Sequence, residues 1–210
     1  SKLSYNYRLL EETGDMGVAL RLLNKIIANV EYIIYMINRK NIYIIVKIAL
    51  YVALLIIASY ISIPLPFTLS VITLHTVVLN IIALTLKPKH ATLCVAIYLV
   101  MGLVGLPVFS LGTPGIARIL SPVGGYYLGF LVSVFVMSLV NKEDSSFKQQ
   151  LVILLAIGLP TQHLCAIFVM LFYNSFDIMN AILTISLPFI IGDVIKAVIS
   201  LLIIRKINTL

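Results

Sequence analysis

The stretch IMNAILTISLPFIIGDVIKAVISLLII, residues 178–204, decides the fold class of this chain. It is long and apolar enough to cross a bilayer as a helix, which takes about 20 such residues. Asp193 and Lys196 are the only charges inside it, and a charge near the bilayer centre costs about 2.5–3.5 kcal/mol. Their i,i+3 spacing places both on one helical face. They form either a structural ion pair or part of a ligand site.

The composition of the whole chain agrees with a membrane protein. Of 210 residues, 61% are hydrophobic and 11% are charged, whereas about a quarter of a soluble domain is charged. The net charge of +7 is spread over short loops, so we expect no nucleic-acid partner. Cys94 and Cys165 lie in apolar runs without metal-ligand spacing. We therefore expect a multi-pass protein of the cell membrane, with no cofactor and no metal site.

Six apolar stretches predict an all-α bundle of six transmembrane helices. They lie at residues 43–61, 68–86, 91–106, 125–140, 151–173 and 178–204. Gly158 and Pro160 predict a kink in the fifth, and Pro188 and Gly192 interrupt the sixth.

The basic residues orient this bundle, because Lys and Arg collect in cytoplasmic loops. One side has Lys25, Arg39, Lys40, Lys87, Lys89, Lys142, Lys148, Arg205 and Lys206. The loops of the opposite side carry Arg118 alone. Both termini are therefore expected to be cytoplasmic. Arg118, in the outer loop 107–124, would lie above Asp193 and Lys196, so that the three bracket an anionic solute; the alternative for Arg118 is a contact with a lipid phosphate.

The N-terminal residues 1–41 differ from the rest. Residues 1–20 are polar, and 21–38 have apolar positions at helical spacing that Lys25 and Glu31 interrupt. This pattern is typical of an amphipathic helix on a membrane surface. We expect an N-terminal extension over 1–41, lying on the cytoplasmic surface, and a membrane domain over 42–206.

Four motifs resemble the BioY family. They are ISIPLPF at 61–67 followed by ITLHT at 72–76, GLVGLPVF at 102–109, SPVGGYYLGF at 121–130, and PFIIGDVIK at 188–196. Their order and spacing match across residues 43–206, although His75 stands where the family usually has Gln. The resemblance implies a biotin-specific substrate-binding component, or S component, of an energy-coupling-factor (ECF) transporter.

The resemblance also implies a biotin site near the outer face. Asp193 would accept from the ureido N–H groups, and Lys196 or Arg118 would bind the carboxylate; the sequence leaves open which. Thr73 and His75 would add polar contacts, unless His75 only packs between helices. Gly112 and Gly115 either fold the outer loop over the ligand or simply form turns. Tyr126 and Tyr127 are expected in the interfacial aromatic belt. The alternative is that one of them stacks on the ligand, and Tyr126 is the candidate binding residue.

Transport requires partners, since the chain has no phosphate-binding GxxxxGK[ST] loop. The resemblance implies a transmembrane coupling (T) component and two ATPase subunits. Ala49 and Ala53 form a small-xxx-small pattern that lets another helix approach closely, and the resemblance implies that this face docks the T component. We therefore expect a transporter subunit and not an enzyme.

Two other functions stay open from the sequence. An S component for a different small vitamin would need the same kind of site. A membrane-embedded enzyme is a weaker alternative: no second acid lies deep in a span, and no Gly-x-Ser-x-Gly motif occurs, although a Ser–His pair is harder to exclude.

Overall fold

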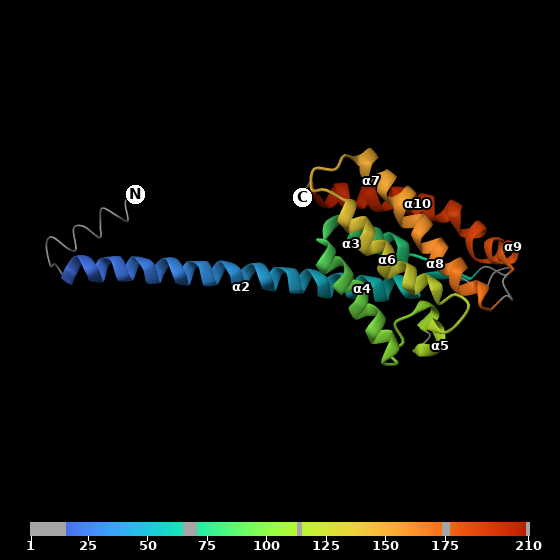
Figure 1. Ribbon diagram of the computed structural model, residues 1–210, viewed down its shortest axis with the longest axis horizontal. Coiled ribbons are helices and arrows are strands. Elements are labelled where there is room, and N and C mark those ends of the chain that lie inside the picture. The colour runs from blue at the N-terminus through green and yellow to red at the C-terminus, as the bar shows by residue number, and fades with distance from the viewer. Residues whose placement is uncertain (1–15, 65–70, 113–114, 174–176, 209–210) are drawn as a thin grey trace. The chain divides into compact units, whose positions relative to one another are not determined.

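The structure is a computed structural model, and it describes residues 16–64, 71–112, 115–173 and 177–208. Within these ranges the regular secondary structure is helical, as predicted, apart from one short two-stranded sheet (Figure 1). The chain forms two compact units, residues 1–46 and 47–210. The second unit contains the site described below.

Helix α2, Met16–Tyr60, is longer than the predicted first span. Residues 38–41 contain polar side chains but neither Pro nor Gly, so no residue type that breaks a helix occurs there. The part of α2 from Asn41 to Tyr60 is long and apolar enough to cross a membrane. The placement of residues 1–41 on a membrane surface stays a prediction.

A short antiparallel sheet follows α2. Strand β1, Ser62–Pro64, pairs with strand β2, Val71–Thr73, so that Ser62 lies opposite Thr73. The β-branched residues of β2 favour this extended conformation. The predicted second span, 68–86, is therefore wrong at its start, because helix α3 covers only His75–Thr85.

The third and fourth predicted spans correspond to α4, Pro88–Leu103, and α6, Gly125–Val140. Helix α4 starts earlier than predicted because Pro88 fits the first turn of a helix, where its missing N–H is not needed. Helix α6 has the predicted limits. The loop between them contains a 3₁₀ turn, η1 (Ser110–Gly112), and a short helix, α5 (Ile116–Ile119).

The last two predicted spans each contain a π-helical turn. The fifth consists of α7 (Phe147–Ile153), η2 (Leu154–Gly158) and α8 (Leu159–Leu171). The sixth consists of α9 (Ile178–Ala181), η3 (Ile182–Ser186) and α10 (Leu187–Asn208). Each π-helical turn ends just before a proline, Pro160 or Pro188, which cannot donate the usual helical hydrogen bond. The irregularity predicted at both prolines is thus a π-helical turn.

Three of the described helical segments are long and apolar enough to cross a membrane: Asn41–Tyr60, Phe147–Leu171 and Leu187–Ile207. Helices α3, α4 and α6 are apolar but shorter. A helix of about 16 residues is about 24 Å long, less than the roughly 30 Å of the hydrocarbon core. Described residues of the segments that connect these helices, namely Thr73, Ser110, Arg118 and Val123, carry part of the site.

Helix α6 is central to the second unit, since it packs against α8, α4 and α3. Two glycines allow its close approach to α8. A Cβ atom at Gly125 would lie 2.4 Å from the carbonyl oxygen of Cys165, and one at Gly129 would lie 2.9 Å from Cα of Gln162. Both distances are shorter than a van der Waals contact, so only glycine fits at these positions.

Gly125→Ala is expected to destabilise the protein by about 1–3 kcal/mol, because the added methyl group forces α6 away from α8. Thermal unfolding of the purified protein in detergent measures this loss. Gly192→Ala is the matched control, since a Cβ atom at Gly192 meets nothing within 4 Å and alanine favours a helix. A Gly125→Ala variant as stable as the control would contradict the close helix contact.

Candidate functional site

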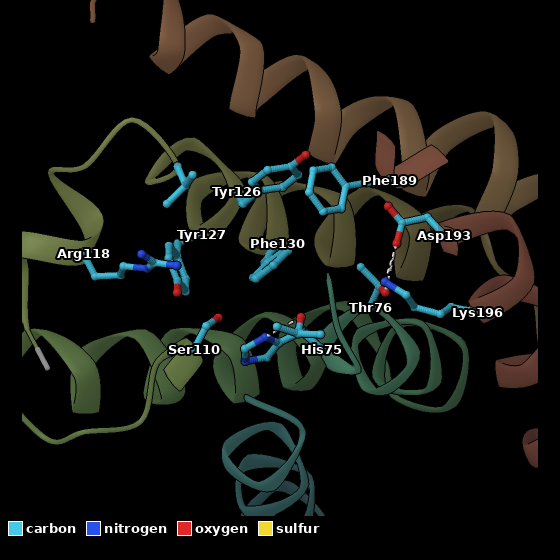
Figure 2. A pocket seen from close by; sticks show the side chains of 12 residues that line it. His75, Thr76, Ser110, Arg118, Tyr126, Tyr127, Phe130, Phe189, Asp193 and Lys196 are labelled. Atoms are coloured by element: carbon cyan, nitrogen blue, oxygen red, sulfur yellow. Dashed lines mark hydrogen bonds and ion pairs between the residues drawn. The ribbon is translucent and has the colours of Figure 1, made fainter. Parts of the chain in front are cut away.

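One cavity of the second unit gathers most of the polar residues that the sequence singled out (Figure 2). Its lining comes from β2 and α3, the loop between α4 and α6, α6 itself, and α10. The lining residues are Thr73, His75, Thr76, Ser110, Arg118, Val123, Tyr126, Tyr127, Phe130, Phe189, Asp193 and Lys196. Arg118 lies at one end and Asp193 with Lys196 at the other, and the rings of the labelled Tyr and Phe residues lie between these charged groups (Figure 2).

The carboxylate of Asp193 accepts hydrogen bonds from three helices. Lys196 Nζ lies 2.7 Å from Oδ1, and Thr76 Oγ1 on α3 lies 3.3 Å from the same oxygen. His163 Nε2 on α8 lies 3.2 Å from Oδ2. The side chains of Asp193 and Lys196 are 13% and 10% exposed, so the pair is largely removed from solvent. A buried ion pair is stabilising only when its remaining polar atoms are also hydrogen-bonded. Thr76 and His163 provide these hydrogen bonds for the carboxylate of Asp193.

His163 is a polar contact of the site that the sequence did not single out. Its Nδ1 contacts Ser186 Oγ at 3.0 Å and Tyr126 Oη at 3.4 Å, so both ring nitrogens have partners. A histidine in an apolar span after Pro160 is itself a signal of a buried polar contact. The partner was not predictable, because Asp193 lies on another helix, 30 residues along the chain.

His75 lies at the start of α3 and is buried. Its Nε2 contacts Tyr98 Oη at 2.7 Å, and its Nδ1 contacts Thr73 Oγ1 at 3.1 Å. The Tyr98 hydroxyl donates to the carbonyl oxygen of Val108 at 3.1 Å. Since that bond uses its only hydrogen, His75 Nε2 is the donor to Tyr98, and Thr73 then donates to Nδ1 of a neutral imidazole. His75 both lines the cavity and links α3 to α4.

Aromatic side chains form one wall of the cavity. The ring of Phe130 lies 5.7 Å from the rings of His75 and Tyr127, measured between centroids. Tyr127 in turn lies 4.5 Å from Phe109. The expectation that both tyrosines belong to the interfacial belt is wrong for Tyr127, which is 4% exposed; Tyr126 also lines the cavity. Flat rings of this kind suit a cyclic ligand.

Arg118 lies at the end of the cavity opposite Asp193 and Lys196 (Figure 2). Its Nε is buried and has no hydrogen-bond partner among the residues that the structure describes. A buried donor of this kind normally finds an acceptor. The guanidinium can therefore bind an anionic group that enters the cavity.

Two tyrosines hold the loop that carries Arg118. Tyr60, at the end of α2, donates to the carbonyl oxygen of Pro107 at 2.5 Å, and Tyr173 donates to the carbonyl oxygen of Leu120. Gly112 and Gly115 lie in this loop with φ angles of 66° and 78°, which favour glycine. Neither glycine lines the cavity, so the structure supports their role in the turns.

Of the eight predicted binding residues, six line the cavity: Thr73, His75, Arg118, Tyr126, Asp193 and Lys196. The residues that the sequence did not single out are Thr76, Ser110, Val123, Phe130 and Phe189, together with Tyr127, which had been placed in the belt. The predicted docking residues Ala49 and Ala53 are both exposed on α2.

The comparison with family models matches residues 33–210 to the BioY family. The chain belongs to the BioY family. It is 36% identical over 168 residues to the "Biotin transporter BioY" of Thermotoga maritima, covering 79% of this chain and 95% of that protein. It is 34% identical over 164 residues to the "Probable biotin transporter BioY" of Pyrococcus horikoshii, covering 77% and 93%.

A solved structure has the same fold. It is the S-component for biotin from an ECF-type ABC transporter, with a TM-score of 0.73 and 25% sequence identity, covering 82% of this chain and 94% of that one. The predicted architecture of a multi-pass membrane protein of the S-component type is thereby confirmed for this BioY-family chain. The resemblance that the four motifs indicated is also confirmed.

The buried ion pair leads to a stability prediction. Lys196→Met leaves Asp193 without its cation and is expected to cost about 3–5 kcal/mol. The double variant Asp193→Asn/Lys196→Met removes both charges and is expected to regain most of that loss. Thermal unfolding in detergent compares the two proteins. A double variant no more stable than Lys196→Met would show that the uncompensated carboxylate is not the cause.

Proposed function

We propose that this protein captures biotin as the S component of an ECF-type transporter and thereby serves biotin uptake. Two curated relatives are named biotin transporters, with one of them called probable, and the structural neighbour is an S-component for biotin. The observation that carries the proposal is the cavity itself. It has an acid–base pair at one end, aromatic walls, and at the other end an arginine whose buried Nε has no partner among the described residues.

The chemistry of biotin matches this arrangement. Its ureido ring has two N–H donors and one carbonyl, its thiophane ring is apolar, and its valerate chain ends in a carboxylate. In the proposal, Asp193 accepts from a ureido N–H and Lys196 donates to the ureido carbonyl. The rings lie against Phe130 and Tyr127. An apolar cavity with a few placed polar groups is the usual form of a small-molecule site.

We assign the carboxylate of biotin to Arg118 in preference to Lys196. The ammonium of Lys196 is already paired with Asp193 at 2.7 Å, whereas Nε of Arg118 has no partner among the described residues. Guanidinium also binds a carboxylate through two parallel hydrogen bonds. The valerate chain would then extend along the cavity from the ion pair toward the loop between α4 and α6.

In this proposal the cavity faces the outer side of the membrane and both termini are cytoplasmic. The distribution of Lys and Arg supports this orientation, because Arg118 is the only basic residue in the predicted outer loops. Substrate from outside would reach the cavity past the loop 104–124. The loop's tyrosine contacts with Pro107 and Leu120 would position Arg118 before the ligand arrives.

An enzyme built on a Ser–His pair is the weaker alternative. Ser186 and His163 do contact each other at 3.0 Å. Ser186 is buried, however, and neither residue is among those that line the cavity. A nucleophile must reach the reacting atom of its substrate, which this serine does not, and we favour a structural role for the pair.

Binding of biotin and of biotin methyl ester tests the proposal, because the ester lacks the negative charge. Asp193→Asn is expected to weaken both ligands by about tenfold or more, since both carry the ureido ring. Arg118→Ala is expected to weaken biotin by about 10–100-fold but the ester by less than about 3-fold. Equilibrium binding to purified protein in detergent gives the dissociation constants.

Thiamine and riboflavin serve as competitors in the same experiment. Displacement of biotin by either one would favour an S component for another vitamin. Failure of folded wild-type protein to bind biotin would overturn the biotin assignment. If Arg118→Ala weakened biotin and the ester equally, Arg118 would not be the residue that binds the carboxylate of biotin, and Lys196 would take that role.

We further propose that a T component docks against Ala49 and Ala53 and that two ATPase subunits supply the energy. Both alanines are exposed on α2, and Leu50 beside them is 58% exposed. In a bilayer such a face contacts either lipid or another helix, and small residues let a helix backbone approach closely. The T component and the ATPases would convert capture into uptake.

Ala53→Trp is expected to abolish co-purification with the T component and to leave biotin affinity within about 3-fold of wild type, because the bulky ring blocks close helix approach. Val132→Trp is the matched control, since Val132 is 44% exposed on α6. Affinity purification of the co-expressed subunits measures the complex. Loss of the complex in both variants, or in neither, would argue against docking at this face.

A further inference from the structure

We propose that His163 is a positioning residue for ligand binding, which orients the Asp193 carboxylate from the side away from the cavity. The inference rests on the proposed function, in which Asp193 accepts from the ureido ring. His163 lies on α8 and is 5% exposed. It does not line the cavity, so it would act on the ligand through the lining residues that it contacts. These are Asp193, whose Oδ2 lies 3.2 Å from Nε2, and Tyr126, whose Oη lies at the longer distance of 3.4 Å from Nδ1.

The hydrogen-bond partners fix the direction of this contact. Asp193 is paired with the ammonium of Lys196 at 2.7 Å, and an ionised carboxylate only accepts hydrogen bonds. Nε2 of His163 is therefore the donor. When the ring is neutral, Nδ1 is an acceptor. The hydroxyl of Ser186 at 3.0 Å is then the nearer donor to it, and that of Tyr126 lies at 3.4 Å. Ser186, His163 and Asp193 thus form a chain of hydrogen bonds that points toward the carboxylate.

Counting acceptor positions shows why Oδ2 is important. A carboxylate offers about four lone-pair positions, two on each oxygen. Lys196 and Thr76 occupy those of Oδ1, and His163 occupies one of Oδ2. One lone-pair position of the carboxylate has no partner among the described residues. It belongs to Oδ2, the oxygen that His163 contacts. A ureido N–H would bind there, at a carboxylate already held in orientation.

A purely structural role for His163 makes a different prediction. Its contact would then resemble that of Gln162, which is also 5% exposed. Gln162 Nε2 donates to Ser133 Oγ on α6 at 3.1 Å, and neither residue lines the cavity. Gln162→Leu therefore removes a polar helix contact next to His163 without touching Asp193, and it serves as the matched control.

His163→Gln and His163→Asn separate the two ends of the imidazole. The amide nitrogen of Gln reaches the position of Nε2 and can still donate to Asp193, whereas the Asn amide reaches only the position of Nδ1. We expect biotin affinity within about 3-fold of wild type for His163→Gln, and a loss of about 10–100-fold for His163→Asn. Gln162→Leu is expected to keep its affinity even where thermal unfolding shows lower stability.

A double-mutant cycle then tests whether His163 acts through Asp193. In the Asp193→Asn background, His163→Asn is expected to weaken biotin by less than about 3-fold further. An equal loss in both backgrounds, or a His163→Gln variant that is folded but binds as weakly as His163→Asn, would overturn the inference. Failure of the wild-type protein to bind biotin would overturn the proposed function, and this is measured before any variant.

Discussion

The need to satisfy one buried carboxylate constrains much of this bundle. Asp193 lies in an apolar helix, and its two oxygens accept from Lys196 on the same helix, Thr76 on α3 and His163 on α8. An unpaired charge in such surroundings is strongly destabilising. The three helices must therefore keep their relative positions for the carboxylate to stay bonded, and the contact that stabilises the bundle also shapes one end of the cavity.

The rest of the cavity is built by close packing and hydrogen bonds to the backbone. Glycines at 125 and 129 bring α6 against α8, which carries the aromatic side chains of α6 to the cavity. The chain of bonds from His75 through Tyr98 to the carbonyl of Val108 connects α3, α4 and the loop between α4 and α6. A ligand would therefore meet walls whose side chains are already fixed by contacts outside the cavity, which lowers the entropy lost on binding.

The sequence predicted the spans, the BioY resemblance and most of the polar residues of the site, because these depend on local patterns. Hydrophobic length gave the limits of α6, and charge in an apolar run singled out Asp193 and Lys196. It did not predict His163 as a partner of Asp193, nor Thr76 and Phe189 in the cavity, since these depend on which helix faces come together. The start of α3 was misplaced because residues 71–73 are as apolar as a helix would be, although they form a strand.

The two π-helical turns change the direction, around the helix axis, in which the side chains after them point. A π-helical turn holds one more residue than an α-helical turn, and one residue corresponds to about 100° around a helix of 3.6 residues per turn. Without η2, the side chain of His163 would be rotated away from α10; without η3, Asp193 would be rotated away from α8. The extra residues before Pro160 and Pro188 thus set the rotational phase at which the histidine and the carboxylate face each other.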